Sequence, residues 1–285
     1  MNIIEILKAI LFGIVEGITE WLPVSSTGHL IILDRFITLK QSEEFKSVFD
    51  VVIQLGAILA VVIIFWKQIW PFGQKPEDPL TPNGIGKYIK KDIFVMWLKI
   101  VVACIPAIVI GLPFDDWFEE HFYNEIVVSL ALIIVGAAFI FIENKNKTKE
   151  SKINSVKDIS FKTAFIIGIF QLIAGIFPGT SRSGSTIIGS LIMGVSRTAA
   201  AEFTFFLGIP TMFGASLLKL VKHGLSFSAP ELAILLIASV VSFAVSMFVI
   251  KFLMGYIKKH DFKVFGWYRI VLGILVIICS LFIFK

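Results

Sequence analysis

The sequence predicts an all-α integral membrane protein in which six transmembrane helices and two re-entrant helical hairpins form two inverted-topology repeats. Three observations lead to this prediction. Of the 285 residues, 56% are hydrophobic and only 16% are charged, whereas a soluble domain carries about 25% charged residues. Six apolar runs are long enough to cross a bilayer. Two further apolar segments are interrupted by polar, proline-containing loops, and these two segments match each other in sequence.

The first apolar segment, residues 3–22, leads into a polar loop and then into a short apolar arm at 30–37. A helical arm of this length is too short to cross ~30 Å of hydrocarbon. Two arms joined by a polar loop are typical of a re-entrant hairpin, which is tolerated where protein buries the loop or where the loop lines a cavity. Residues 161–177 and 187–194 repeat this arrangement, so we expect a second hairpin there.

Six spans are expected at residues 47–66, 93–112, 124–142, 199–220, 230–250 and 265–284. The loops 67–92, 143–162 and 251–264 are rich in Lys, whereas the loop 113–123 has no Lys or Arg and the loop 221–229 has one Lys. Positive residues favour the cytoplasmic side, so we place the Lys-rich loops in the cytoplasm and both termini outside. The charge of every loop fits this placement only if each hairpin returns to the side of the membrane from which it enters. The net charge of +5 therefore reflects topology, not binding to nucleic acid.

The two hairpins align without gaps at an offset of 155 residues, so that GIVEGITEWLPVSST at 13–27 lies over GIFQLIAGIFPGTSR at 168–182. This alignment pairs Pro23 with Pro178, and Ser26 with Ser181. A second match follows each hairpin: Asp50 and Leu55-Gly56 correspond to Glu202 and Leu207-Gly208.

Each predicted repeat contains one hairpin and three spans, and because three is odd the second repeat must be inverted. Inverted repeats with broken helices that meet near the midplane are typical of many membrane transporters. We therefore expect a single membrane domain over 1–285, with repeats at about 1–143 and 160–285 joined by a Lys-rich cytoplasmic loop. The polar tips of the two hairpins should meet.

The first predicted tip carries two carboxylates and a histidine. Glu16 and Glu20 are four residues apart and so project from one face of a helix. They lie at the C-terminal end of a half-helix, where the dipole disfavours a carboxylate unless a cation or a proton joins it. His29 is a candidate base on the following arm. Three hydroxyl residues suit the N-terminus of that arm, whose free N–H groups suit an anion: Ser25, Ser26 and Thr27.

The second predicted tip combines hydroxyl residues and glycines with Arg182 at a helix N-terminus. Backbone N–H groups and hydroxyls donate to an oxyanion there, and a guanidinium binds phosphate through two parallel hydrogen bonds. The candidate phosphate-binding residues are Gly179, Thr180, Ser181, Ser183 and Thr186, together with Ser25 and Thr27 of the first tip. At this point a purely structural ion pair of Glu16 and Glu20 with Arg182 remains an open alternative.

EGITEWLPVSSTGH at 16–29 and PGTSRSGST at 178–186 resemble the two signature segments of bacterial undecaprenyl-pyrophosphate phosphatases of the bacitracin-resistance type. The resemblance extends over essentially the whole chain. It implies hydrolysis of undecaprenyl or another long-chain polyprenyl pyrophosphate to the monophosphate and inorganic phosphate, which recycles the lipid carrier of cell-wall synthesis and gives bacitracin resistance. It also implies functional roles for Glu16, Glu20, Ser26, His29 and Arg182, and dependence on a divalent cation.

The expected catalytic residues are Glu20, Ser26, His29 and Arg182. Arg182 would stabilise the transition state, and Glu16 and Glu20 would bind Mg²⁺ or Ca²⁺. Ser26 would attack with His29 or Glu20 as base, or would orient a water. The main alternative is a transporter or flippase of prenyl phosphate.

The resemblance implies that this multi-pass protein lies in the bacterial plasma membrane. From the distribution of Lys residues among the loops, we expect its site to open to the extracytoplasmic face. The expected partners are membrane lipid and the polyprenyl pyrophosphate, without nucleic acid, and a homodimer is left open.

Overall fold

The computed structural model describes residues 2–73, 88–224 and 227–282, and it is all-helical in these parts. Within them, six helices are long and apolar enough to cross a membrane, which confirms the six expected spans. The α-helices are α1 (Ile3–Thr19), α2 (Ser26–Phe36), α3 (Glu43–Ile64), α4 (Trp66–Ile69), α5 (Lys91–Pro106), α6 (Leu112–Phe122), α7 (Glu125–Asn146), α8 (Phe161–Ile176), α9 (Arg182–Ile192), α10 (Arg197–His223), α11 (Ala229–Tyr256) and α12 (Lys263–Phe282). The protein is therefore a multi-pass membrane protein.

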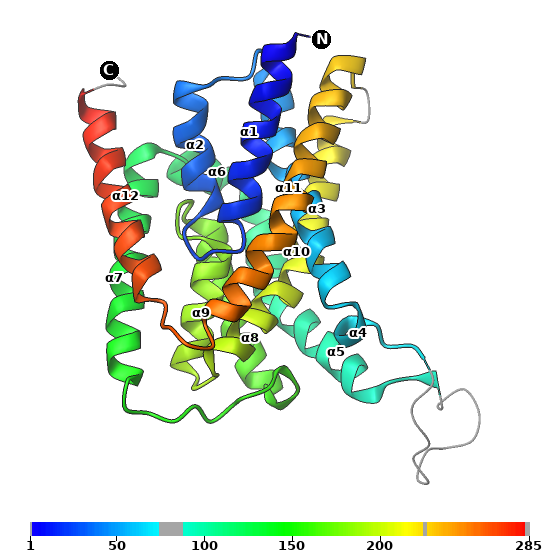
Figure 1. The fold of residues 1–285 in the computed structure, drawn as a ribbon, viewed down its shortest axis with the longest axis vertical. Coiled ribbons are helices and arrows are strands. Elements are labelled where there is room, and N and C mark those ends of the chain that lie inside the picture. Colours follow the sequence, from blue (N-terminus) through cyan, green and yellow to red (C-terminus); the bar gives the residue numbers. More distant parts are fainter. Residues whose placement is uncertain (1, 74–87, 225–226, 283–285) are drawn as a thin grey trace.

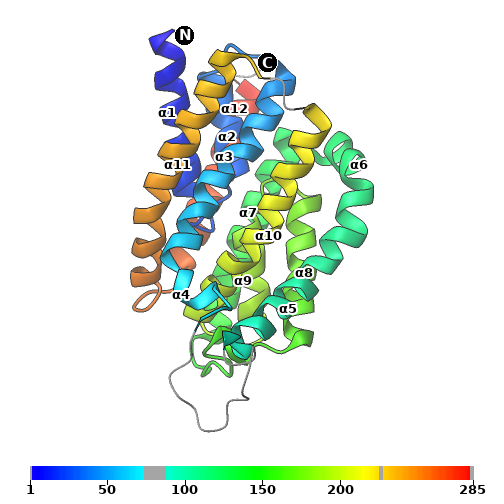
Figure 2. The same ribbon diagram turned by 90° about the vertical axis from the view of Figure 1, so that its right-hand side faces the viewer.

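The helices form an elongated bundle with both chain ends at the same end of the molecule (Figures 1 and 2). Large apolar side chains cover the outside of its long helices: Phe248 of α11 is 76% exposed, and Ile134 of α7 is 64% exposed. Contiguous apolar surface of this kind is rare on soluble monomers. The surrounding lipid provides the apolar environment that these side chains require.

Apart from the four-residue α4 and the pair α5 and α6, which form one continuous span, four helices in the described residues are too short to cross a bilayer alone. α1, α2, α8 and α9 contain 17, 11, 16 and 11 residues, which corresponds to lengths of about 16 to 26 Å. α1 and α2 reach the end of the bundle that carries the termini, whereas α8 and α9 reach the opposite end (Figure 1). The connecting segments, residues 20–25 (tip 1) and 177–181 (tip 2), lie inside the bundle.

The second arm of each pair begins at Ser26 and Arg182, and a serine caps each helix, as the hydroxyl residues before these positions predict. Ser25 accepts a hydrogen bond from the backbone N–H of Gly28 at 3.2 Å, and Ser181 accepts one from Gly184 at 3.1 Å. Both cap residues have the left-handed backbone, with φ of 77° and 70°, which is uncommon for a residue other than glycine.

These caps correct the alignment of the two tips. The gapless alignment pairs Ser26 with Ser181, but the caps with the same φ and the same side-chain bond are Ser25 and Ser181. The reason is one extra residue in tip 2, since two residues separate Pro178 from its cap and one separates Pro23 from its cap. Ser26 therefore corresponds in position to Arg182.

The expected loop at 113–123 is also wrong, because most of this segment is helix α6. α5 continues through a π-helical turn at Ala107–Gly111, directly after Pro106, into α6. π-Helical turns occur within α-helices. Two of the four acidic residues in this segment pair with α10, since Lys222 Nζ lies 2.9 Å from Asp116 and Lys219 Nζ lies 3.3 Å from Glu119.

Glycines let α1 and α3 approach α11 closely. A Cβ atom added at Gly13 or Gly17 of α1 would lie 2.5 or 2.7 Å from a backbone oxygen of α11, and one added at Gly56 of α3 would lie 2.0 Å from another. Such distances force a shift of the backbone. These contacts fix the position of α1 along α11, a spanning helix, and therefore also fix the position of tip 1.

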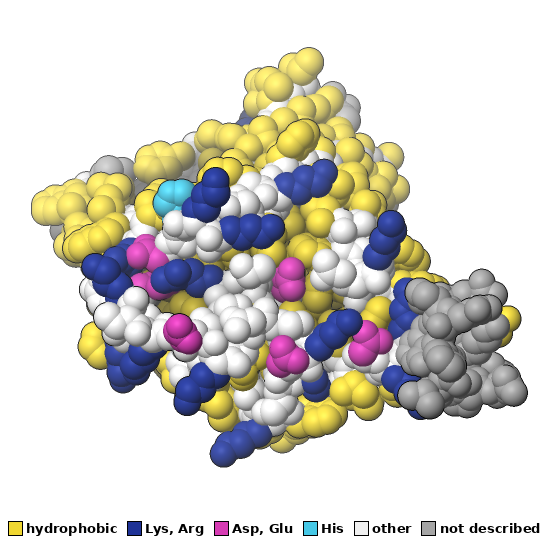
Figure 3. All heavy atoms as spheres, turned by 60° about the horizontal axis from the view of Figure 1, so that its bottom comes forward, with side chains coloured by type: hydrophobic (Ala, Val, Ile, Leu, Met, Phe, Trp, Pro, Cys, Tyr) yellow, Lys and Arg dark blue, Asp and Glu magenta, His cyan; other side chains and the backbone are white. Residues whose placement is uncertain are grey.

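The end of the bundle opposite the termini is rich in lysine and arginine side chains (Figure 3). The connections there include those between α3 and α5, α7 and α8, and α11 and α12 (Figure 1). They carry the three Lys-rich segments of the sequence, although Lys75 and Lys87 lie outside the described residues. All the Lys-rich connections are thus at one end of the molecule.

Candidate active site

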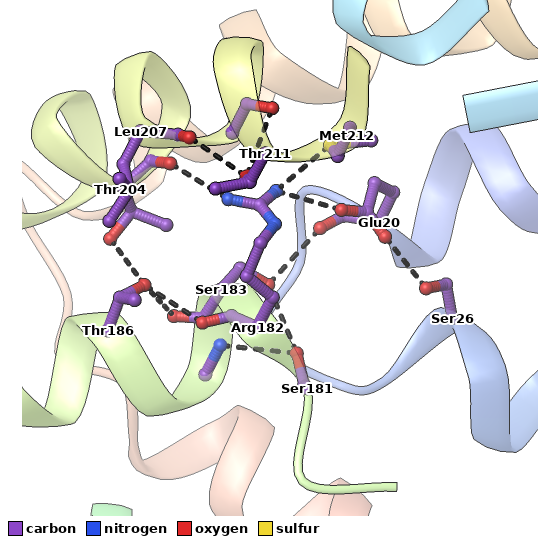
Figure 4. Close-up of polar contacts among 12 residues, drawn as sticks. Glu20, Ser26, Ser181, Arg182, Ser183, Thr186, Thr204, Leu207, Thr211 and Met212 are labelled. Atoms are coloured by element: carbon purple, nitrogen blue, oxygen red, sulfur yellow. Dashed lines mark hydrogen bonds and ion pairs between the residues drawn. The ribbon is translucent and has the colours of Figure 1, made fainter. Parts of the chain in front are cut away.

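One carboxylate joins the two tips (Figure 4). Glu20, the C-cap of α1, accepts a hydrogen bond from Ser26 Oγ at 2.7 Å through Oε2. Its other oxygen, Oε1, lies 2.8 Å from Arg182 Nη2. Glu20 and Ser26 are each only 7% exposed. The tips therefore meet in a buried cluster that contains a hydroxyl, a carboxylate and a guanidinium.

α10 holds the Arg182 guanidinium in place. Nη1 donates to the backbone carbonyl of Thr204 at 2.9 Å, and Nη2 lies 3.4 Å from the Met212 sulfur. A Cβ atom at Gly208 would lie only 2.8 Å from Nη1, so the side chain lies directly on the glycine backbone. An arginine fixed in this way is pre-organised for an anion.

The hydroxyl groups of tip 2 and α9 are mostly engaged with protein. Ser183 Oγ donates to the Glu20 carbonyl at 3.1 Å, which is a second link between the tips. Thr186 Oγ1 lies 2.8 Å from Thr204 Oγ1 behind the arginine, and Ser181 caps α9. Of these candidate phosphate-binding residues, the structure brings Ser183 to the cluster and directs Thr186 away from it (Figure 4).

Arg269 of α12 is a site residue that the sequence reasoning missed. Its fully buried guanidinium donates to three backbone carbonyls: Nη1 to Pro23 of tip 1 at 3.1 Å, and Nη2 to Gly179 and Thr180 of tip 2 at 2.8 Å each. Arg269 therefore clamps both tips together. The available signal was a charged residue within the apolar run 265–284, since such residues are expensive in a membrane and usually functional.

Gly179 and Thr180 contribute packing and carbonyl groups to this clamp. Gly179 has φ of 89°, and a Cβ atom there would lie 2.6 Å from the Val128 carbonyl oxygen of α7. Thr180 is 3% exposed. Because their carbonyls accept bonds from Arg269, these two residues hold tip 2 in shape.

Glu16, one turn before Glu20, is fully buried, and neither of its carboxylate oxygens has a hydrogen-bond partner among the described residues. A buried carboxylate is costly unless a proton, a cation or a donor joins it. The described residues contain no group of three or more His, Cys, Asp or Glu that could hold a metal. The residues present nevertheless fit Mg²⁺, which is typically held by one or two carboxylates together with substrate phosphates.

Within the described parts of the chain, the His29 ring makes its hydrogen bonds to groups other than the Ser26 hydroxyl. Its Nδ1 lies 2.7 Å from the Ser25 carbonyl oxygen, and its Nε2 lies 2.7 Å from the Tyr268 hydroxyl. Tyr268, the neighbour of Arg269 in α12, is a second contact of the tips that the sequence did not predict, because nothing in the tip sequences points to it. Both ring nitrogens of His29 are therefore occupied in this structure.

A cavity of about 760 Å³ lies between α2, α3, α6, α10 and tip 2. Its walls include Thr27 of α2, Asp50 of α3 and Lys219 of α10, and Pro178 of tip 2. Thr38, which also lines it, directly follows α2 at the end of the bundle that carries the termini. The cavity thus extends from that end of the bundle to the edge of the tips. Thr27, one of the candidate phosphate-binding residues, lines it.

The fold and the site together define a multi-pass, all-helical membrane protein with a buried Ser–Glu–Arg cluster between two helix-breaking tips. A sequence model of the family described as bacitracin resistance protein BacA matches residues 9–275. The chain belongs to this family.

Curated relatives match over almost their entire length. The chain is 58% identical over 280 residues to an undecaprenyl-diphosphatase of Enterococcus faecalis, covering 98% of this chain and 99% of the relative. It is 60% identical over 278 residues to an undecaprenyl-diphosphatase of Desulfitobacterium hafniense, covering 98% and 97%. It is 58% identical over 283 residues to undecaprenyl-diphosphatase 1 of Clostridium acetobutylicum, covering 99% and 100%. The family resemblance of the two signature segments is confirmed.

Proposed function

We propose that this protein hydrolyses undecaprenyl pyrophosphate to undecaprenyl phosphate and inorganic phosphate, and thereby recycles the lipid carrier and gives resistance to bacitracin. The names of its full-length relatives support this activity. The observation that carries this proposal is the pair of contacts made by Glu20, which accepts a hydrogen bond from Ser26 at 2.7 Å and forms an ion pair with Arg182 at 2.8 Å. A hydroxyl in contact with a carboxylate and next to a fixed guanidinium suits phosphoryl transfer.

In the proposed reaction, Ser26 Oγ attacks the terminal phosphorus and Glu20 takes the hydroxyl proton. The bond between the terminal phosphorus and the bridging oxygen breaks, and the prenyl monophosphate leaves with the bonding electrons. Water then hydrolyses the phosphoserine and releases inorganic phosphate. Arg182, whose Nη2 lies 2.8 Å from Glu20, binds the transferred group and stabilises the negative charge of the transition state.

Glu20 is the better supported base. Among the described residues, it is the group with a hydrogen bond to Ser26 Oγ, whereas His29 bonds to Ser25 and Tyr268. A base must lie within hydrogen-bond reach of the proton that it removes.

Glu16 and Glu20 are the residues that would hold a divalent cation, Mg²⁺ or Ca²⁺, with the pyrophosphate oxygens as further ligands. The cation would neutralise charge on the phosphates. The two unpartnered oxygens of Glu16 support this assignment.

The proposal for the membrane arrangement is that α1–α2 and α8–α9 are re-entrant hairpins and that the chain consists of two inverted repeats, at about 1–143 and 160–285. The lengths of the four short helices and the matched caps Ser25 and Ser181, which both have positive φ, support it. With the Lys-rich end in the cytoplasm, the 760 Å³ cavity opens to the extracytoplasmic face. A homodimer stays a prediction, which light scattering of the purified protein tests.

The test of the activity is release of phosphate from undecaprenyl pyrophosphate by purified protein in detergent, where no gradient exists. We expect release with Mg²⁺ or Ca²⁺, little with EDTA, and losses of at least about a hundredfold for Arg182→Ala and Glu20→Gln. Lys149→Ala, at an exposed position in the α7–α8 connection, is the control that should retain full activity. Folded wild-type protein that releases no phosphate with any metal would overturn the hydrolase and favour a transporter of prenyl phosphate.

A further inference from the structure

Tyr268 contacts His29 in two ways. Its hydroxyl lies 2.7 Å from His29 Nε2. The two rings also stack, with centroids 5.6 Å apart and an interplanar angle of 5°. Tyr268 belongs to α12 and His29 to α2, so this contact ties the arm that follows tip 1 to a spanning helix.

The contacts of His29 determine its tautomer. The Ser25 carbonyl oxygen, 2.7 Å from Nδ1, can only accept a hydrogen bond, so Nδ1 carries a hydrogen. In neutral His29 the other nitrogen, Nε2, then accepts from the Tyr268 hydroxyl. In the cationic form Nε2–H donates to the same hydroxyl, because a hydroxyl both donates and accepts. Tyr268 therefore holds the ring in one orientation in either protonation state.

His29 in turn holds a strained turn. Ser25 has φ of 77°, a conformation that a non-glycine residue keeps only when its surroundings enforce it. Its carbonyl accepts from the His29 side chain at 2.7 Å and from the His29 backbone N–H at 3.3 Å. The next residue is Ser26, whose Oγ bonds to Glu20. The direction of the Ser25 turn therefore sets the direction of Ser26 Oγ.

We propose that Tyr268 is a positioning residue: it fixes His29, His29 braces the Ser25 turn, and this turn aligns Ser26 Oγ with Glu20. His29 then acts on the reaction through the Ser25 carbonyl, not by exchanging a proton with Ser26. The kinetic consequence rests on the proposed hydrolase function. The structural consequence, which is the Nδ1–H tautomer of His29, does not.

The kinetic test compares Tyr268→Phe with Tyr256→Phe as the matched control. Tyr256 stacks on His260 with ring centroids 4.3 Å apart at the end of α11, at the Lys-rich end of the bundle. We expect Tyr268→Phe to lower kcat roughly ten- to a hundredfold with KM nearly unchanged, because alignment of Ser26 is lost and phosphate binding is not. Tyr256→Phe should have wild-type kcat. Wild-type kcat in Tyr268→Phe would overturn the proposal.

His29 variants separate bracing from proton transfer. The amide N–H₂ of His29→Asn can still donate to the Ser25 carbonyl, but an amide does not act as a base. We expect His29→Asn to retain activity near that of Tyr268→Phe and well above that of His29→Ala, and His29→Ala/Tyr268→Phe to be no slower than His29→Ala. Equal loss in His29→Asn and His29→Ala would indicate proton transfer and contradict the bracing role.

The tautomer is measured without activity, by ¹⁵N NMR of histidine side chains in detergent, with the His29 signals assigned through His29→Ala. The expected result is an Nδ1–H imidazole in the wild type, and a mixture of tautomers or a shifted Nε2 signal in Tyr268→Phe. An Nε2–H tautomer in the folded wild type would overturn the inference even if the protein is a hydrolase. Absence of hydrolysis together with an Nδ1–H tautomer would instead contradict only the proposed function.

Discussion

At the scale of single residues, Glu16 is a buried carboxylate whose two oxygens have no hydrogen-bond partner in the part of the chain that the structure describes. Glu143 of α7 is equally inaccessible, but it accepts bonds from Arg197 and from the backbone N–H of Phe262 at 3.0 Å. Burial of a charge without compensation costs stability, whereas removal of one partner from a buried pair costs more. The two carboxylates should therefore respond differently to neutralisation.

We predict that Glu16→Gln leaves the free energy of unfolding in EDTA unchanged or raises it by up to about 1 kcal/mol, because it replaces a buried carboxyl group whose oxygens have no hydrogen-bond partner among the described residues. The same change should abolish metal-dependent phosphate release, because a neutral amide is a poor ligand for Mg²⁺. Glu143→Gln, the matched control, should lower the melting temperature and keep activity. Thermal unfolding in detergent and the phosphate assay measure both properties, and a fall in the stability of Glu16→Gln would count against this account.

Arg269 provides the second prediction at this scale. Arg269→Lys keeps the charge, but an ammonium on a single stem cannot reach three carbonyls in the geometry of a planar guanidinium. Each buried carbonyl left unpaired costs about 1–3 kcal/mol, and the contact between the tips loosens. We expect a lower melting temperature and a loss of activity of at least about tenfold.

Arg197→Lys is the control for Arg269→Lys, since it disturbs a partly buried ion pair with Glu143 away from the tips. It should destabilise the protein and leave most of the activity at a temperature where the protein is folded. Similar activity losses in the two variants would mean that Arg269 contributes general stability only.

The sequence predicts the residues that the tips themselves carry, since Glu20, Ser26 and Arg182 stand next to the signals that break the helices, Pro23 and Pro178. It does not predict Tyr268 and Arg269, which belong to α12 and reach the tips only through tertiary packing. The sequence alignment of the tips also could not reveal that tip 2 has one more residue between its proline and its cap. Ser26 and Ser181 are both serine, so the alignment pairs them, whereas the structure pairs the caps Ser25 and Ser181.

At the scale of helices, the position of tip 1 depends on how closely α1 packs on α11. A Cβ atom at Gly17 would lie 2.7 Å from the Ser242 carbonyl oxygen and 2.8 Å from Val245 Cβ. Gly17 is three residues before Glu20, so a shift of α1 at this point moves the carboxylate directly.

We predict that Gly17→Ala lowers the free energy of unfolding by about 1–3 kcal/mol through overpacking, and that it lowers kcat more than its effect on stability explains. Gly214→Ala in α10 is the matched control, because no atom lies within 4 Å of an added Cβ there. Alanine favours a helix over glycine by up to about 1 kcal/mol, so this variant should be unchanged or more stable. Normal activity in folded Gly17→Ala would show that tip 1 is not fixed by this contact.

Helix content was predictable where hydropathy alone decides, as in the six spans. It was not predictable at 113–123, where four acidic residues lower the hydropathy although the backbone stays helical. Two of these, Asp116 and Glu119, pair with lysines of α10, and such pairing across 100 or more residues leaves no local signal.

At the scale of the whole molecule, the two ends of the bundle differ in charge, and this difference sets the expected orientation. The Lys-rich connections lie at one end (Figure 3), whereas the termini and the α2–α3 connection lie at the other (Figure 1). Because positive loops are retained in the cytoplasm, the cavity that reaches the tips should face outward. The orientation also decides which side of the membrane supplies the pyrophosphate.

Cysteine labelling in intact cells tests this orientation and the two hairpins together. The background is a variant in which Cys104 and Cys279 are replaced by alanine, and each test protein carries one new cysteine. Cysteines at Ile3 and Lys40 flank α1–α2. Cysteines at Lys149 and Lys258 flank the longer stretch that contains α8–α9 and the two spans α10 and α11. We expect a membrane-impermeant maleimide to label Ile3→Cys and Lys40→Cys in intact cells, and Lys149→Cys and Lys258→Cys only after lysis. Since two spans return the chain to the same side, opposite labelling within either pair would mean that the short helices cross the membrane, and the inverted arrangement would then fail.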